Sequence, residues 1–134
     1  MTGLVLKRGP RERVLINGVV VENGERRGRI NILTPDAKIL RLKDAIHPDE
    51  ATTPVRRVCY LLQLILSGDL TQHDGRKEVL RTIEKLSYAF LDSDSRRILD
   101  VSTDHILKDQ FYPALKSLRM LLSREARLLG AGAQ

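Results

Sequence analysis

The residues best suited to binding a ligand are seven basic side chains near the start of the sequence. They lie between positions 7 and 29 and are Lys7, Arg8, Arg11, Arg13, Arg26, Arg27 and Arg29. A planar guanidinium group donates two parallel hydrogen bonds, which suits it to phosphate. This cluster predicts binding of a polyanion, for which nucleic acid and anionic membrane are the usual candidates. The competing interpretation is a charged surface that contacts only water.

Charge is unevenly distributed along the 134 residues, whose formal net charge is +6. Residues 1–48 hold 10 Lys and Arg against 5 Asp and Glu, whereas residues 49–134 hold 13 against 12. Membrane is the less favoured partner because the apolar stretch Val58–Leu66 is interrupted by Gln63 and is too short to span a bilayer. The first residues lack the basic and apolar segments of a signal peptide. With Cys59 as the single cysteine, we expect a reducing, cytoplasmic location.

Residues with catalytic or metal-binding chemistry are dispersed. The three histidines, His47, His73 and His105, have no second ligand at a metal-binding spacing. The acidic segment Asp92–Ser95 lacks the glycine and glutamate of a calcium loop, so we interpret it as a helix cap. Nucleophile elbow, phosphate-loop and dinucleotide motifs are missing from the sequence. We therefore expect no enzyme activity, no metal and no cofactor.

The basic residues fall in a part of the sequence that has the pattern of β-strands. Two Asn-Gly pairs, at 17–18 and 23–24, favour tight hairpin turns between β-branched runs. We predict a meander with strands at about 3–7, 12–16, 19–22 and 25–33, and a fifth at 37–41. Alternation places Arg27, Arg29 and Asn31 on one face and Ile30 and Ile32 on the other. The apolar runs 14–16 and 19–21 predict strands that are central or covered by helices.

From about residue 49 the apolar period becomes helical. Helices are predicted at 54–67, from about 71–74 to 90, from 93 or 95 to 106, and at 113–129. The predicted fold is α+β, a small N-terminal antiparallel β-meander packed with a C-terminal bundle of three to four helices. Its parts are a basic β-meander unit at 1–48, the expected polyanion-binding part, the bundle at 49–129 and a frayed tail at 130–134, within one continuous domain.

The helix predicted at 54–67 has an unusually wide apolar face. Leu61 and Leu64 extend it beyond one stripe, so this helix is either fully buried or shared with a partner protein. The predicted partner-binding residues on it are Arg56, Arg57, Tyr60, Leu61 and Leu64.

The mode of nucleic-acid binding is narrowed by the aromatic residues. All five lie in the helical part: Tyr60, Tyr88, Phe90, Phe111 and Tyr112. The strand unit therefore lacks an aromatic platform for stacking bases, and contact would depend on phosphates, arginine stacking and strand edges.

The sequence resembles the FlbT family of flagellin-expression regulators of alphaproteobacteria. The resemblance is carried by the segment Glu12–Arg27, by Ile39–Arg41 with the pair at 43–44, and by Thr53–Gln63. It departs from the family at Cys59-Tyr60, where an aromatic pair is expected. The family implies binding to the 5′ untranslated region of flagellin mRNA, which holds back translation and promotes decay. A second small protein, FlaF, acts in opposition.

A shorter likeness, over about twenty residues, is to the carbon storage regulator family, which also represses mRNAs. It rests on Leu4–Arg8 followed by Glu12 and Ile16, and implies RNA contacts by Leu6, Lys7 and Arg8. The leading hypothesis is a post-transcriptional repressor whose basic strand unit binds a leader RNA, with a homodimer through open strand edges as one arrangement. The rival is a protein-interaction adaptor or flagellin secretion chaperone whose helices bind FlaF or flagellin.

Overall fold

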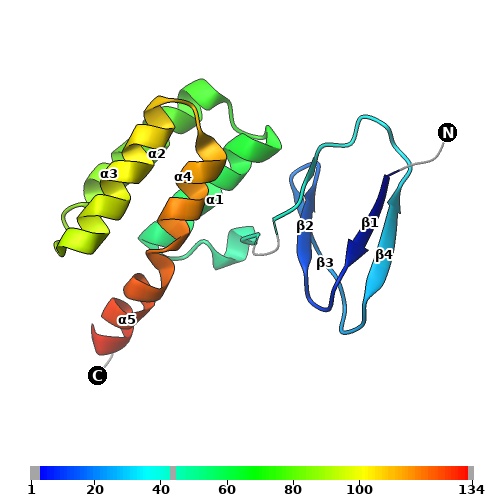
Figure 1. Cartoon of the computed structure of the whole chain (residues 1–134), viewed down its shortest axis with the longest axis horizontal. Coiled ribbons are helices and arrows are strands. Elements are labelled where there is room, and N and C mark those ends of the chain that lie inside the picture. Colours follow the sequence, from blue (N-terminus) through cyan, green and yellow to red (C-terminus); the bar gives the residue numbers. More distant parts are fainter. Residues whose placement is uncertain (1–3, 43–44, 133–134) are drawn as a thin grey trace. The chain divides into compact units, whose positions relative to one another are not determined.

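The computed structural model describes residues 4–42 and 45–132. The chain divides into two compact units, Met1–His47 and Pro48–Gln134. The first contains the strands and the second contains the helices (Figure 1). This arrangement confirms the predicted α+β class, and each unit is described separately below.

The strand unit consists of two small antiparallel sheets. The strands are β1 (Leu4–Arg8), β2 (Arg13–Ile16), β3 (Val19–Glu22), β4 (Gly28–Ile32) and β5 (Ile39–Leu40). In one sheet β1 pairs with β4, and in the other β2 lies between β3 and β5.

The first of the two predicted Asn-Gly turns is confirmed, and the second is wrong. Asn17 and Gly18 both have positive φ, at 50° and 80°, and join β2 to β3. At Asn23-Gly24 no hairpin forms, because β3 does not pair with β4. Instead, the Asn23 side chain contacts the backbone at the end of β1. Its amide donates to the carbonyl oxygens of Arg8 at 3.1 Å and Gly9 at 2.7 Å.

The predicted meander is therefore corrected to one long, bent hairpin. Its outer half is the ladder from Leu4 opposite Ile32 to Arg8 opposite Gly28. Its inner half is the β2–β3 ladder, extended by a hydrogen bond of 2.9 Å from the Arg11 N–H to the Gly24 oxygen. The segment between β3 and β4 is one residue longer than the segment between β1 and β2 that lies opposite it. The extra residue forms a β-bulge, which bends the two-stranded ribbon.

Strand order also explains which apolar side chains are covered. Val14 and Leu15 of β2 are each 1% exposed, as expected for the central strand of three. β3 is an edge strand and its Val19 is 61% exposed, so the prediction of a central or helix-covered strand is wrong there.

The helical unit contains a 3₁₀ turn, η1 (Pro48–Glu50), followed by longer helices. These are α1 (Pro54–Ser67), α2 (Gln72–Leu86), α3 (Ser93–Leu107), α4 (Phe111–Arg119) and α5 (Leu122–Gly132). Figure 1 shows α1, α2, α3 and α4 side by side, and the fully buried side chains of this unit include Val58, Leu62, Val79, Ile106 and Leu118.

The predicted helix starts follow from side-chain caps. Thr53 accepts a hydrogen bond from the Arg56 N–H at 3.3 Å, and Asp92 accepts one from the Ser95 N–H at 3.0 Å. The Ser95 hydroxyl and N–H stabilise the carboxylate, so the pKa of Asp92 lies below its ordinary value. The interpretation of the segment Asp92–Ser95 as a cap is confirmed.

The fourth predicted helix is divided into α4 and α5 at Met120. There the N–H groups of Met120 and Leu121 donate to residues three positions back, at 3.1 and 3.0 Å, in place of the regular four. Leu121 is buried after this tighter turn, whereas Leu129, predicted to face inward, is 55% exposed. Of the predicted tail 130–134, α5 includes Gly130 and ends at Gly132, and positions 133–134 lie outside the described residues.

A buried carboxylate connects α5 to the start of α1. Glu125 is 6% exposed, and its Oε2 accepts a hydrogen bond of 2.8 Å from the Val55 N–H. Its Oε1 accepts a second hydrogen bond from the Thr53 hydroxyl. Negative charge is favourable at a helix N-terminus, where the first N–H groups have no partner within the helix. Glu125 thus acts as a cap supplied from a distant part of the sequence.

Close packing at Gly75 leads to a stability prediction. Gly75 is buried in α2, and a Cβ atom placed on it would overlap the Ile65 side chain. We expect Gly75→Ala to lower the free energy of unfolding by about 1 kcal/mol, because overpacking outweighs the better helix propensity of alanine. Gly130→Ala is the matched control, since a Cβ there meets nothing within 4 Å and should be neutral or stabilising. Urea unfolding followed by circular dichroism measures both, and equal effects would contradict the overlap.

Candidate nucleic-acid interface

The β1–β4 ribbon presents basic side chains on one face. Lys7 and Arg29 are directly opposite each other in the ladder, and both are exposed. Exposure alternates along β4 as predicted, with Arg29 exposed and Ile30 half-buried. On the opposite face Leu6 is 1% exposed. One side of the ribbon therefore contacts the core of the unit while the other carries positive charge to solvent.

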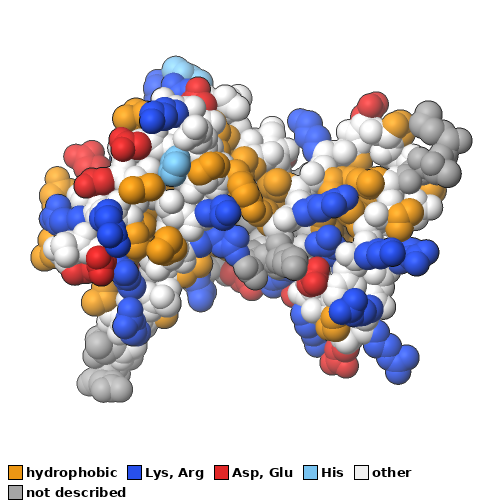
Figure 2. All heavy atoms as spheres, viewed as in Figure 1, with side chains coloured by type: hydrophobic (Ala, Val, Ile, Leu, Met, Phe, Trp, Pro, Cys, Tyr) orange, Lys and Arg blue, Asp and Glu red, His pale blue; other side chains and the backbone are white. Residues whose placement is uncertain are grey.

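A hollow of about 620 Å³ brings four of the predicted basic residues together. Its basic lining residues are Lys7, Arg8, Arg27 and Arg29. Within residues 4–42 and 45–132, Lys7, Arg27 and Arg29 have no carboxylate partner. Figure 2 shows Lys and Arg side chains exposed over the strands of this unit. These cations are available to an incoming anion.

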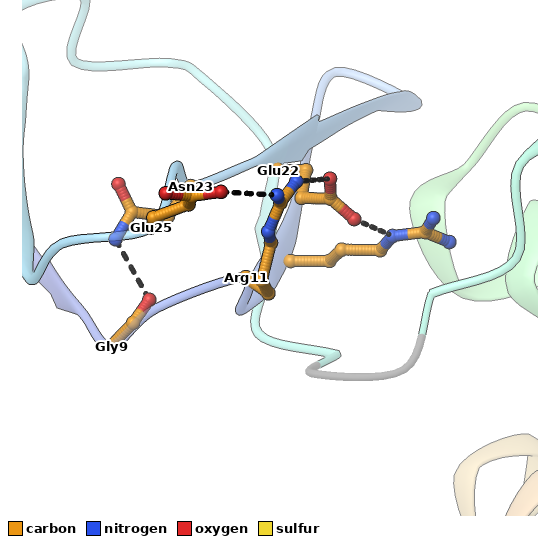
Figure 3. A network of polar contacts seen from close by, with 6 residues as sticks. Gly9, Arg11, Glu22, Asn23 and Glu25 are labelled. Atoms are coloured by element: carbon orange, nitrogen blue, oxygen red, sulfur yellow. Dashed lines mark hydrogen bonds and ion pairs between the residues drawn. The ribbon is translucent and has the colours of Figure 1, made fainter.

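Arg11 and Arg13 are held at the bend of the hairpin by carboxylates. Glu22 contacts both: one of its oxygens lies 3.6 Å from the Arg11 Nη1 (Figure 3), and the other lies 3.0 Å from the Arg13 Nε. Glu25 makes a second ion pair with Arg11 at 3.2 Å. Arg13 Nη1 also donates to the Ala45 carbonyl oxygen at 2.6 Å. Arg11 and Arg13 thus differ from Lys7, Arg27 and Arg29, which line the hollow without a carboxylate partner among the described residues.

Asn23 and Gly28 position the arginines that border the hollow. The Asn23 amide also donates to the Arg26 carbonyl oxygen at 2.8 Å, which fixes the backbone just before Arg27. A Cβ on Gly28 would approach the Asn23 Oδ1 to 2.9 Å, so a larger residue would displace this side chain. Arg26 itself is exposed and lies outside the hollow.

Arg8 and Leu6 differ from the other predicted RNA contacts. The Arg8 side chain is only 11% exposed, and its Nη1 lies 3.5 Å from the Glu12 carboxylate. The Leu6 side chain is buried, so the contact implied by the carbon storage regulator family is not open to it. We assign Arg8 a supporting position at the edge of the hollow.

Two exposed residues beside the basic pair were not predicted as site residues. Val5 lies opposite Asn31 in the ladder, two positions from the pair of Lys7 and Arg29 on the same face. Val5 is 45% exposed, and Asn31 is exposed. An apolar surface next to an amide suits contact with a base rather than with a phosphate. The alternation along 25–33 already placed Asn31 with the arginines.

The predicted partner-binding residues lie on α1 in the helical unit. Arg57, Tyr60 and Leu61 line an apolar groove of about 600 Å³ between α1 and α2. Arg56 is exposed and Leu64 is half-buried, and neither lines the groove. The sequence left open whether this helix is fully buried. It is not, because Tyr60 and Leu61 on α1 are only half-buried.

The thiol of Cys59 is buried, which protects it from chemical modification. Desolvation raises the pKa of Cys59 to about 12, and the Arg119 charge lowers it by a smaller amount. Because the thiolate is the nucleophile, the folded protein should resist alkylation. The contribution of Cys59 to the free energy of unfolding decreases as pH rises above about 9. The reason is that the thiol ionises at a lower pH in the unfolded chain than in the folded chain.

We expect iodoacetamide at about pH 8 to leave the folded chain unmodified and to label it once urea unfolds it. Mass spectrometry measures both states. Labelling of the folded chain at the unfolded rate would contradict the burial of Cys59.

Two structural features bear on other classes of site. In the part of the chain that the structure describes, no three His, Cys, Asp or Glu residues are grouped so as to hold a metal ion. Within the same residues, every helix is too short or too polar to cross a bilayer.

Comparison with known proteins identifies the family. Residues 4–129 match the family described as flagellar protein FlbT, and the chain belongs to that family. It is 30% identical over 127 residues to the "Probable flagellum biosynthesis repressor protein FlbT" of a Caulobacter species, covering 95% of this chain and 96% of the relative.

Two further relatives have corresponding names. The "Flagellum biosynthesis repressor protein FlbT" of Caulobacter vibrioides is 28% identical over 95% of this chain and 89% of its own length. A relative from Rhodopseudomonas palustris is 30% identical over 90% of this chain and 92% of its own length. No solved structure matches the chain.

Proposed function

We propose that this protein is a cytoplasmic, non-enzymatic repressor of flagellum biogenesis that acts on mRNA. In this proposal it binds the 5′ untranslated region of flagellin mRNA, inhibits translation and promotes decay by a recruited nuclease. The names of the relatives support repression. The observation that carries RNA binding is the hollow on the β1–β4 ribbon, where Lys7, Arg27 and Arg29 are exposed without carboxylate partners in the described chain.

The chemistry of the hollow and of the exposed strand face beside it favours a single-stranded leader over a duplex. Adjacent cations contact phosphates, while Val5 and Asn31 offer an apolar surface and an amide to an unpaired base. Because the strand unit lacks aromatic side chains, affinity depends mainly on charge. Binding across a ribosome site is sufficient to hold back translation.

Filter binding with a flagellin leader at two salt concentrations tests the proposal. If about four phosphates are neutralised, affinity should fall about fiftyfold between 50 and 200 mM salt. The matched control is an unrelated RNA of the same length, which separates charge attraction from sequence preference. Absence of binding at low salt, or affinity that ignores salt, would contradict the proposed RNA site.

The groove between α1 and α2 favours a second candidate function. In this alternative the protein is an adaptor or flagellin secretion chaperone that acts with FlaF, through Arg57, Tyr60 and Leu61. Pull-down with FlaF or flagellin after RNase treatment discriminates the two functions. A protein partner that is retained without RNA supports the adaptor, and a partner lost on RNase treatment supports the RNA repressor.

A further inference from the structure

We propose that the groove between α1 and α2 binds an amphipathic helix with acidic flanks from a partner protein. The inference goes beyond RNA binding, since it involves only residues of the helical unit, and it gives the adaptor role a ligand of defined chemistry. It rests on the shape, the apolar lining and the charge of the groove.

The lining of the groove is apolar at its base. Pro54 and Leu61 contribute from α1, and Leu86 contributes from α2 with Ala89 just beyond it. Leu86 is 3% exposed and forms the floor, while Leu61 is half-buried and forms part of a wall. A concave apolar strip between two helices is the surface on which an amphipathic helix places its hydrophobic face.

The dimensions suit a helical segment. The α2 side of the groove extends from Glu78 through Thr82 to Leu86, which at 1.5 Å per residue is about 12 Å. This length matches two to three turns of a bound helix, whose apolar side chains recur every three or four residues.

Tyr60 provides an anchor of the kind found at protein interfaces. Its ring is half-buried in the lining, and within the described residues its hydroxyl has no hydrogen-bond partner. Tyrosine is enriched in interfaces because its ring is apolar while its hydroxyl still requires a polar partner. A bound helix would supply that partner.

The charges at the rim select an acidic occupant. Glu78 is 3.2 Å from the Arg81 Nη1 and is neutralised by it. Arg57 and Lys85 are exposed and have no carboxylate partner in the described part of the chain. The rim therefore presents two uncompensated positive charges on either side of an apolar strip, and carboxylates flanking a leucine stripe are complementary to it.

The test uses the full-length protein and two synthetic amphipathic helices of about 16 residues, long enough to form helix in water. Both carry a leucine stripe, flanked by glutamates in one peptide and by lysines in the other. Fluorescence anisotropy should show that the acidic peptide binds at least about tenfold more tightly than the basic peptide at low salt.

Two variants locate the binding. Arg57→Glu with Lys85→Glu, both exposed, should reverse the preference, and Leu61→Asp should weaken both peptides at least about tenfold. Leu107→Asp, at an exposed position of α3 outside the groove, is the matched control and should change nothing. Circular dichroism establishes that each variant is folded.

Three outcomes would overturn the inference. They are equal affinity for the two peptides, a charge-reversed variant with unchanged preference, and a dimer that Leu61→Asp dissociates, which would mean that a second copy occupies the groove. A variant with Arg27→Glu and Arg29→Glu should keep peptide binding. Failure of RNA binding and failure of this inference are therefore distinguishable.

Discussion

Reversing the charge of Arg27 and Arg29 is expected to lower the affinity for a flagellin leader RNA about a hundredfold at about 100 mM salt. Both side chains border the same hollow, and neither has a carboxylate partner among the described residues. The double variant Arg27→Glu with Arg29→Glu would remove two of the proposed phosphate contacts and add repulsion. The slope of log affinity against log salt should also become shallower by about 1.4.

Two controls separate this site from a general effect of charge. Lys77→Glu with Arg127→Glu makes the same change in net charge on exposed positions of the helical unit and should alter affinity by less than about threefold. Arg11→Ala removes a cation that is already paired with Glu22 and Glu25, so the salt slope should stay the same. Equal losses in the two charge-reversed double variants would show that binding follows net charge and not the hollow.

Removing the Glu125 side chain is expected to lower the free energy of unfolding by about 3 kcal/mol. Glu125→Ala leaves the Val55 N–H without its buried acceptor and the Thr53 hydroxyl without its partner. It also removes a negative charge from the N-terminus of α1, where that charge is favourable. Equilibrium urea unfolding followed by circular dichroism measures the loss.

Glu125→Gln and Ser123→Ala complete this experiment. Glutamine preserves the shape and one oxygen acceptor, so it should cost less than alanine, about 1–2 kcal/mol. Ser123 is an exposed residue of α5, and its replacement should change stability by less than about 0.5 kcal/mol. A Glu125→Ala variant as stable as Ser123→Ala would exclude the capping role.

Local patterns in the sequence were sufficient to predict most of the strands and helices and the exposed basic face. The turn at Asn17-Gly18 depends on two residues with positive φ, and the cap at Thr53 depends on a side chain three residues from its donor. Alternation along β4 places Arg29 outside because a strand has a period of two. Each of these features is decided within a few residues.

Features that depend on tertiary contacts were not predicted. The ion pairs of Arg11 with Glu22 and Glu25 require the bend of the hairpin, where the Asn23 amide contacts the carbonyl groups of residues 8 and 9. The break at Met120 has no glycine or proline to mark it. The groove depends on how α1 and α2 pack, and a single helical pattern does not contain that information.

The contact between Glu125 and α1 has a consequence for synthesis on the ribosome. Leu4 pairs with Ile32, and both residues are synthesised early. The Val55 N–H, in contrast, is capped by the Glu125 carboxylate, which lies 70 residues further along the chain. Chains emerge N-terminus first, so the hairpin's pairs are complete while most helices are still untranslated. The basic ribbon can therefore form on the nascent polypeptide well before α1 receives its final hydrogen bonds.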